Sequence, residues 1–297
     1  LDYNTDLFDI ATIRQLFEHY IHLLSSVCER PHDAIFEHAL LSVEERKRIL
    51  LDWSADQPND VKASGLIEQF QRQAQLTPNQ IAIICENDAL SYRELDQQSS
   101  QLAHYLQEQG VISGERIGVC MPRGVRAIVA LLAVFKTAAV YVPMTPDFPD
   151  ARLRHQLNDG NIKTVLTHTS LRDGLTVWQD KPDLLCICLD EVWHRVSTLA
   201  SKGTFLLPAD QVAYVIYTSG STGISKGVLI GHRSLAHHCQ VMRDYYQLSS
   251  HDTVLGFASL AVDASIEQLL PALLCGATVS LRPDHVWSVQ EFMDHVN

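Results

Sequence analysis

The chain has 297 residues, a formal net charge of −12 and 46% hydrophobic residues. This length allows one or two globular domains, and the ordinary hydrophobic content excludes classes outside globular proteins. The acidic balance argues against nucleic acid or an anionic membrane as the main partner. No apolar run reaches membrane-spanning length, so we expect neither a nucleic-acid nor a membrane protein.

The cysteine pattern predicts a reducing, cytoplasmic compartment. Seven cysteines are scattered along the chain, and no pair forms C-x-x-C. An odd, scattered set fits structural thiols better than a disulfide framework. His237, His238 and Cys239 are adjacent, but no second ligand pair of known spacing accompanies them, so we predict no metal site. The chain begins at Leu1 rather than Met, which suggests a piece of a longer protein or a processed end.

The first 55 residues predict helices. Pro31 separates two segments, and the second begins with a capping-box pattern at Ser42 and Glu45 that predicts a helix to about Trp53. The first segment has apolar residues spaced three and four apart, which predicts a helix over residues 12–27 with one apolar face: Ile13, Leu16, Phe17, Tyr20, Leu23, Leu24 and Val27. Such amphipathic helices need a partner surface.

Residues 56–64 are polar and unpatterned, which predicts a linker. From Gly65 onward helices and strands alternate, which predicts an α/β fold with parallel β-sheets flanked by helices. A hairpin turn is expected at Asn87 and Asp88. The expected helices cover residues 66–76, 91–110, 125–136, 151–157, 232–246 and 265–274; the expected strands cover 81–85, 89–92, 116–120, 140–142, 164–167, 184–189, 212–217, 228–230, 253–257 and 278–281.

A loop of Thr, Ser and Gly lies between two neighbouring apolar runs, 212–217 and 228–230. Its glycines let backbone N–H groups turn toward an anion, and a lysine adds a charge suited to phosphate. We predict a polyphosphate-binding loop made by Thr218, Ser219, Gly220, Ser221, Thr222, Gly223 and Lys226.

A flexible linker and the P-loop of NTPases are two alternatives to a polyphosphate-binding loop here. A Ser/Gly-rich stretch can be a flexible linker, but flanking strands and a nearby lysine argue against that. The motif G-x-x-x-x-G-K-[ST] of P-loop NTPases fails twice, because Ser225 stands at its second glycine and Gly227 follows Lys226.

The loop resembles the phosphate loop of the adenylate-forming enzymes. Residues 217–228 match Y-T-S-G-S-T-G-x-P-K-G-V except for Ser225 in place of proline, and His232 falls at the family's histidine. The lost proline removes a fixed φ, which predicts a more mobile loop. Residues 90–95 match L-[TS]-Y-x-E-L. Residues 135–145 resemble L-K-A-G-x-A-Y-V-P-I-D but depart at both ends and at the glycine, around Ala138.

The N-terminal part narrows this resemblance. Residues 1–55 resemble the closing tail of a condensation domain in nonribosomal peptide synthetases, and residues 65–297 resemble the N-terminal portion of an adenylation domain. The resemblance implies that the parent protein activates an amino acid with ATP and Mg²⁺ to an aminoacyl-adenylate. It also implies transfer to the phosphopantetheine thiol of a carrier protein, with carrier and condensation domains as partners in the same synthetase.

Two acidic residues are candidates for substrate binding. Residues 256–278 resemble the family segment containing F-D-x-S, with Val262 in place of the Phe. From the residues alone, Asp263 caps a helix; the resemblance implies that it pairs with the substrate's α-ammonium. Glu267, one turn further, is either a solvated helix charge or, at the family's side-chain pocket, a partner for a basic side chain such as lysine or ornithine.

Several parts that the family needs do not occur before Asn297, including Y-G-P-T-E, T-G-D and the catalytic lysine of the small C-terminal domain. The catalytic residue is therefore expected beyond this chain. Two alternatives stay open. One is an acyl-CoA synthetase or stand-alone acyl-adenylating ligase. The other is a non-catalytic remnant that acts as a nucleotide-binding or interaction module.

Overall fold

The computed structural model describes residues 2–53, 65–178, 181–201, 203, 205, 210–218, 225–285 and 287–296. Residues 294–296 are described by their backbone alone. The chain divides into two compact units, Leu1–Val61 and Lys62–Asn297. The α/β fold expected from the sequence is confirmed in the second unit, and the first unit is helical.

The N-terminal unit is built on α1 (Ile10–Glu29), which Asp9 caps through a 2.8 Å bond from the Thr12 N–H. After a short 3₁₀ turn, η1 (Ile35–Glu37), α2 (Val43–Lys47) runs on into the π-helical η2 (Arg48–Asp52). The predicted capping box is half formed, because Ser42 accepts from the Glu45 N–H at 3.1 Å. The Glu45 carboxylate instead contacts Gln15 at 2.6 Å and His19 at 2.7 Å, joining α2 to α1.

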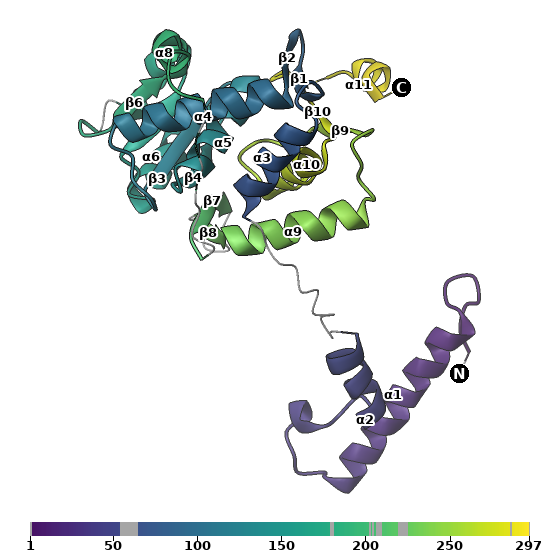
Figure 1. Ribbon diagram of the computed structural model, residues 1–297. Helices are drawn as coiled ribbons and strands as arrows, with labels where there is room; N and C mark the ends of the chain where they lie inside the picture. The colour runs from purple at the N-terminus through teal and green to yellow at the C-terminus, as the bar shows by residue number, and fades with distance from the viewer. Residues whose placement is uncertain are drawn as a thin grey trace. The chain divides into compact units, whose positions relative to one another are not determined.

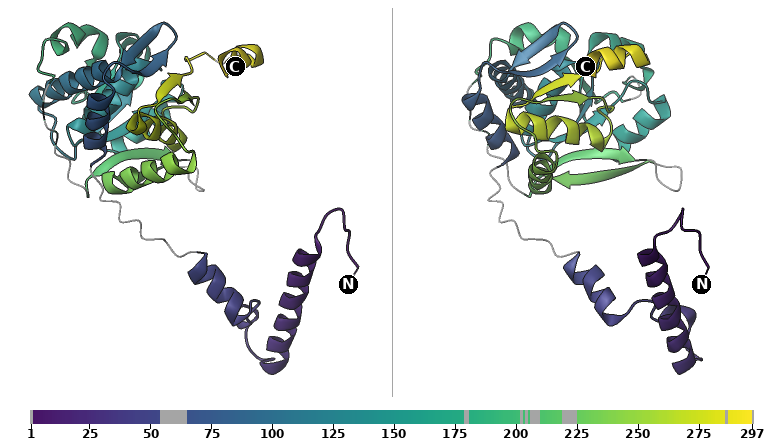
Figure 2. Two further views of the ribbon diagram at one scale, coloured as in Figure 1. Left: turned by 45° about the vertical axis from the view of Figure 1, so that its right-hand side comes forward. Right: turned by 90° about the vertical axis from the view of Figure 1, so that its right-hand side faces the viewer.

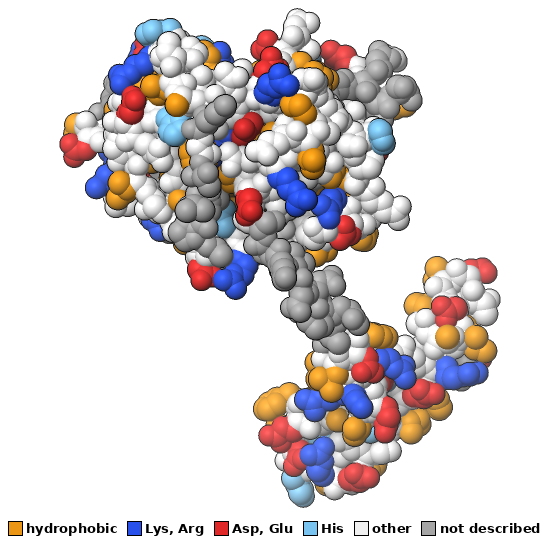
Figure 3. Space-filling model, viewed as in Figure 1, with side chains coloured by type: hydrophobic (Ala, Val, Ile, Leu, Met, Phe, Trp, Pro, Cys, Tyr) orange, Lys and Arg blue, Asp and Glu red, His pale blue; other side chains and the backbone are white. Residues whose placement is uncertain are grey.

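The apolar face of α1 is largely uncovered within this unit. Figure 3 shows apolar side chains, in orange, at the surface of the N-terminal unit. Six of the large apolar side chains on α1 are each at least 40% exposed: Leu16, Phe17, Tyr20, Ile21, Leu24 and Val27. The expectation that these helices need a partner surface therefore remains open.

The second unit contains two sheets (Figure 1). The four-stranded sheet has the order β2-β1-β10-β9, formed by β1 (Ile81–Cys85), β2 (Asp88–Ser91), β9 (Thr253–Gly256) and β10 (Thr278–Leu281). The six-stranded sheet has the order β6-β5-β3-β4-β7-β8, formed by β3 (Arg116–Cys120), β4 (Val140–Met144), β5 (Thr164–Thr167), β6 (Leu185–Cys188), β7 (Val212–Thr218) and β8 (Lys226–Gly231).

Strand pairing is parallel except for one antiparallel hairpin at an edge of each sheet, β1–β2 and β7–β8. The hairpin turn predicted at Asn87 and Asp88 lies one residue earlier, because Cys85 pairs with Asp88. Burial of Leu90 on the core side favours this register, since a one-residue slip of β2 against β1 would turn Leu90 outward. Glu86 therefore takes the left-handed conformation, with φ 53°.

Helices flank both sheets. They are α3 (Leu66–Leu76), α4 (Tyr92–Glu108), α5 (Val125–Lys136), α6 (Asp150–Asp159), α7 (Thr169–Gly174), the 3₁₀ turn η3 (Thr176–Trp178), α8 (Leu189–Val196), α9 (His232–Tyr245), α10 (Asp263–Cys275) and α11 (Val289–Val296). The sequence did not predict α7, α8 or α11, which are too short to give a clear helical period. Over the residues described, no helix combines the length and apolarity needed to cross a membrane.

Helix α5 lies between the two sheets. It contacts β3 and β4 of one sheet and β1 and β2 of the other. Every residue of α5 except Arg126 is buried, as expected for a helix that is apolar on all sides. The core therefore runs continuously through α5 from one sheet to the other.

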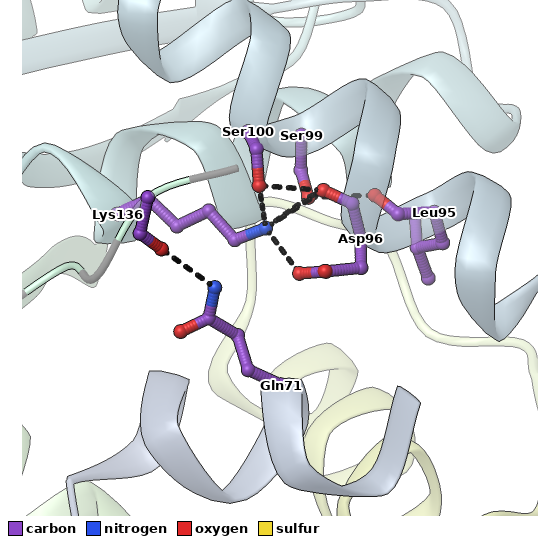
Figure 4. Close-up of polar contacts among 7 residues, drawn as sticks. Gln71, Leu95, Asp96, Ser99, Ser100 and Lys136 are labelled. Atoms are coloured by element: carbon purple, nitrogen blue, oxygen red, sulfur yellow. Dashed lines mark hydrogen bonds and ion pairs between the residues drawn. The ribbon is translucent and has the colours of Figure 1, made fainter. Parts of the chain in front are cut away.

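A buried lysine ends α5 and ties it to α4 (Figure 4). Lys136 is 2% exposed. Its ammonium donates to the Asp96 carboxylate at 2.7 Å, the Asp96 carbonyl at 2.9 Å, and the hydroxyls of Ser99 and Ser100 at 2.8 Å each. Burial lowers the pKa of Lys136 to about 8, and Asp96 opposes this shift. A buried charge needs such partners because it has lost its hydration.

Ala138 follows α5 in a left-handed conformation, with φ 57°. The adenylate-forming pattern has glycine at this position, and a Cβ disfavours this backbone region. Its backbone is held on both sides: the Ala138 N–H donates to Phe135 at 3.0 Å, and its carbonyl accepts from Gly114 at 2.8 Å. The surrounding structure thus maintains a strained residue.

We predict that Ala138→Gly raises the free energy of unfolding by about 1 kcal/mol, because removing the steric strain outweighs the added freedom of the unfolded chain. Denaturant titration or thermal unfolding measures the change. Ala139→Gly is the control: Ala139 is also buried but has no positive φ, so we expect it to lose stability. A loss of stability in Ala138→Gly would contradict this account.

Candidate functional site

Strands β7 and β8, which flank the predicted phosphate loop in the sequence, form an antiparallel hairpin (Figure 1 and Figure 2). Thr218 ends β7 and Lys226 begins β8, and the two residues are direct partners in the antiparallel ladder. Their Cα atoms are therefore about 4.5–5.5 Å apart. Both are exposed. The rest of the prediction, Ser219, Gly220, Ser221, Thr222 and Gly223, lies outside the described residues.

Helix α6 holds both ends of this loop. His155 Nε2 donates to the Ser225 carbonyl at 2.8 Å, and Arg152 donates to the Tyr217 carbonyl at 3.3 Å. The Tyr217 hydroxyl donates to Asp159 at 2.7 Å. Burial, together with that hydrogen bond, raises the pKa of Tyr217. The loop therefore starts and ends on backbone groups that are fixed by one helix.

Thr218 and Lys226 lie at the carboxyl edge of the six-stranded sheet. Strands β3, β4 and β7 are parallel neighbours, so their carboxyl ends meet at one edge. Open α/β sheets bind ligands in the crevice at this edge. Lys226 is the charged residue at the loop's end and is well placed to meet an anion there.

A pocket of about 340 Å³ lies between the β7–β8 hairpin and helices α9 and α10. Asp263 and Glu267, which the sequence proposed as substrate-binding residues, both line it. The full lining is Tyr214, Ile230, Ser234, Leu235, His238, Asp263, Ala264, Ile266 and Glu267. The structure therefore brings the two predicted carboxylates into one pocket.

Asp263 lies in the first turn of α10, where a carboxylate is expected, but it is not the N-cap that the sequence predicted. The N-cap of α10 is Val262, whose backbone is extended, and Asp263 is the first helical residue. The Asp263 carboxylate is exposed and, among the described residues, accepts a single local bond from the Ala264 N–H, at 2.9 Å. Burial raises the pKa of Tyr214, and the Asp263 charge adds to that rise. Asp263 thus faces the pocket rather than the helix end.

Glu267 contacts two residues that the sequence analysis missed. Its carboxylate accepts from the Tyr246 hydroxyl at 2.8 Å and lies 3.5 Å from His238 Nε2. The side chain is 34% exposed. His238 lies on α9 and Tyr246 directly after it, so only the packing of α9 against α10 brings them to Glu267. The adjacent histidines were visible in the sequence, but nothing there pointed to this partner.

The loop and the pocket share the same hairpin. Tyr214 and Ile230, which line the pocket, are ladder partners, as are Thr218 and Lys226 at the loop. Thr218 lies four residues after Tyr214 along β7, which corresponds to about 13 Å. A ligand of moderate size can therefore reach from the pocket to the loop.

His232, the residue at the family's histidine position, is the first residue of α9 and is 3% exposed. Its ring lies edge-on to Phe135, 5.3 Å between centroids. Burial lowers the pKa of His232 to about 4, so the imidazole is neutral at pH 7. Neither ring nitrogen has a hydrogen-bond partner among the described residues.

These features define a class of protein: an α/β fold with a β-hairpin that has Thr218 and Lys226 at the carboxyl edge of the sheet and lines an acidic pocket. A family model described as AMP-binding enzyme matches residues 70–296. The chain belongs to the AMP-binding enzyme family.

Curated relatives extend the similarity over nearly the whole chain. Tyrocidine synthase 3 of Brevibacillus parabrevis is 33% identical over 290 residues, which cover 96% of this chain and 4% of that protein. Gramicidin S synthase 2 of Brevibacillus brevis is 31% identical over 278 residues, which cover 94% of this chain and 6% of that protein. The chain thus spans only a small part of these relatives.

Two solved structures are also similar to this chain. The nonribosomal peptide synthetase FmoA3 matches with a TM-score of 0.79 and 26% identity, over 97% of this chain and 30% of that one. The N-terminal subdomain of NpsA from Klebsiella oxytoca, in complex with 3-hydroxyanthranilyl-AMSN, matches with a TM-score of 0.69 and 25% identity, over 78% of this chain and 57% of that one.

We predict that Ser225→Pro, which restores the family's residue, lowers the KM for ATP about 2- to 5-fold in the intact protein. Proline fixes φ and reduces the conformational freedom that the loop loses on binding, and the carbonyl that accepts from His155 is kept. Steady-state kinetics at varied ATP concentration measures this. Ser225→Ala is the control, and an unchanged or higher KM for Ser225→Pro would contradict the prediction.

Proposed function

We propose that the protein containing this chain catalyses the reaction of an amino acid with ATP to give an aminoacyl-adenylate and pyrophosphate, and then transfers the acyl group to the phosphopantetheine thiol of a carrier protein. The observation that carries the proposal is the shared hairpin, which has Thr218 and Lys226 at one end and the pocket of Asp263 near the other. The similarity to gramicidin and tyrocidine synthases supports it.

In this proposal the loop binds the β- and γ-phosphates of ATP. Backbone N–H groups and hydroxyls of residues 218–223 donate to phosphate oxygens, and Lys226 supplies a positive charge. Mg²⁺ enters with ATP and neutralises further phosphate charge. The chain's contribution is then mainly positioning and electrostatic stabilisation.

Asp263 binds the α-ammonium of the substrate. Its carboxylate is exposed in the pocket and has no cationic partner among the described residues. A charge-assisted bond to an ammonium is strong, and an acid without an amine would leave this carboxylate unpaired. The pocket therefore favours an amino acid over the plain carboxylic acid that a general acyl-CoA synthetase or acyl ligase would take.

Glu267 favours a basic side chain. It lies one helical turn from Asp263 in the same pocket, and its contacts with Tyr246 and His238 hold the carboxylate in place. A second ammonium, as in lysine or ornithine, would find a partner there.

Residues 1–55 form, in our proposal, the end of a condensation domain, and residues 65–297 the first part of the adenylation domain. The uncovered apolar face of α1 supports a neighbouring domain that packs on it. Carrier and condensation domains of the same synthetase are then the partners of this chain.

The role of Lys226 is testable by replacement in the intact protein. We expect Lys226→Ala to depress ATP–pyrophosphate exchange about 100-fold or more, as removal of a charged transition-state contact does, while amino-acid binding changes little. Lys163→Ala is the control, because Lys163 is likewise exposed but precedes β5 at the opposite edge of the sheet. Equal losses in exchange and amino-acid binding would count against a phosphate role.

A substrate panel tests the pocket. We expect exchange with lysine or ornithine to exceed exchange with leucine or phenylalanine, and Glu267→Gln to reduce this preference about tenfold, since it removes one charge-assisted contact. Asp263→Ala should abolish exchange with all amino acids. Strong exchange with leucine or phenylalanine and none with basic amino acids would refute the assignment of Glu267.

A further inference from the structure

The segment between β9 and α10 determines where Asp263 lies. Strand β9 ends at Gly256, α10 begins at Asp263, and the six residues between them form no regular helix or strand. A carboxylate that binds an ammonium must be held in a fixed position. The groups that hold this segment therefore bear on the site, although they do not line the pocket.

Arg123 reaches this segment from the other sheet. It follows β3 and precedes α5, and its guanidinium donates to the carbonyls of Gly256 at 2.7 Å and Ala258 at 2.5 Å. The Asp284 carboxylate, just after β10, accepts from the Arg123 backbone N–H at 3.2 and 3.1 Å. The carboxyl ends of β3, β9 and β10 are thus joined through one arginine.

The opposite side of the segment is held by α10 itself. Gln268 Oε1 accepts from the N–H groups of Phe257 and Ala258, at 3.0 and 2.9 Å. Ala258 is therefore bonded through both its N–H and its carbonyl, from two different elements. Such a pair of bonds leaves the backbone at the start of the segment little freedom.

The Arg123 side chain is half-buried, and burial lowers its pKa, with a smaller effect from the nearby Arg282 charge. A desolvated guanidinium makes stronger bonds to carbonyl oxygens than an exposed one. Arg123 lines a cavity of about 220 Å³ that also touches Ser259, Leu260 and Ala261. The segment thus lines this cavity and leads directly into the residues that line the pocket of Asp263 and Glu267.

We propose that Arg123 is a positioning residue for amino-acid binding. It fixes the segment from Gly256 to Val262 and through it the Asp263 carboxylate, without touching the substrate. This inference rests on the proposed function, in which Asp263 binds the α-ammonium. Arg123, which follows β3 of the six-stranded sheet, thus acts in recognition through a segment that follows β9 of the four-stranded sheet.

The test uses Arg123→Met and Arg123→Lys in the intact synthetase. Arg126→Met is the matched control: Arg126 lies three residues on, is also half-buried, and instead places its guanidinium 3.6 Å from the centre of the Trp193 ring. We expect Arg123→Met to raise the KM for the amino acid about 10- to 100-fold, as a small misplacement of a binding group does. The KM for ATP should stay within about twofold of the wild type.

Arg123→Lys keeps the charge but lacks the planar guanidinium that donates to two carbonyls. We therefore expect a smaller rise in the amino-acid KM than in Arg123→Met. The lysine variant should also fold even where the methionine variant does not. Hydrogen exchange of residues 256–262 gives a readout independent of activity. We expect faster exchange there in both Arg123 variants and not in Arg126→Met.

Two results for the amino-acid KM would overturn the inference. One is an amino-acid KM in both Arg123 variants no different from that of Arg126→Met. The other is faster exchange of residues 256–262 without a change in that KM. Unaltered hydrogen exchange of residues 256–262 in the Arg123 variants would refute the contact between Arg123 and this segment, and with it the inference. A wild-type protein that catalyses ATP–pyrophosphate exchange with none of the amino acids tested would instead refute the proposed function.

Discussion

The burial of α5 on every side is the constraint on which the other elements rely. A helix with no solvent-facing stripe is stable only when other elements cover all of it, and here a sheet lies on each side. Each fully buried Leu, Ile or Val of α5 contributes on the order of 1.5–3 kcal/mol. The one charged end, Lys136, is tolerated because Asp96, Ser99 and Ser100 replace its hydration.

This packing also determines where ligands can bind. Because α5 holds the two sheets together, the carboxyl ends of β3 and β4 lie near those of β9 and β10, and residues that follow all four strands line one cavity. The β7–β8 hairpin extends the same edge and carries the loop. The proposed phosphate binding, the proposed amine binding and the arginine contact thus all depend on one shared edge.

The elements themselves follow largely from local patterns. The alternation of strands and helices predicted the α/β class, and α4 begins with a capping box formed by Ser91 and Glu94, two residues only three apart in the sequence. The loop of Thr, Ser and Gly led to the family before any fold was known. Short elements such as α7 and α8 escaped prediction, because six or eight residues give too little periodicity and are stabilised by their neighbours.

Residues close together in the chain were enough to identify the family. They were also enough to propose the phosphate loop with Lys226, and Asp263 and Glu267, as candidate site residues. The packed fold was needed to show that Asp263 faces a pocket rather than capping α10, that Glu267 meets His238 and Tyr246, and that Arg123 holds the segment before Asp263. These contacts join residues from separate elements, and long-range packing leaves no periodic trace in the sequence.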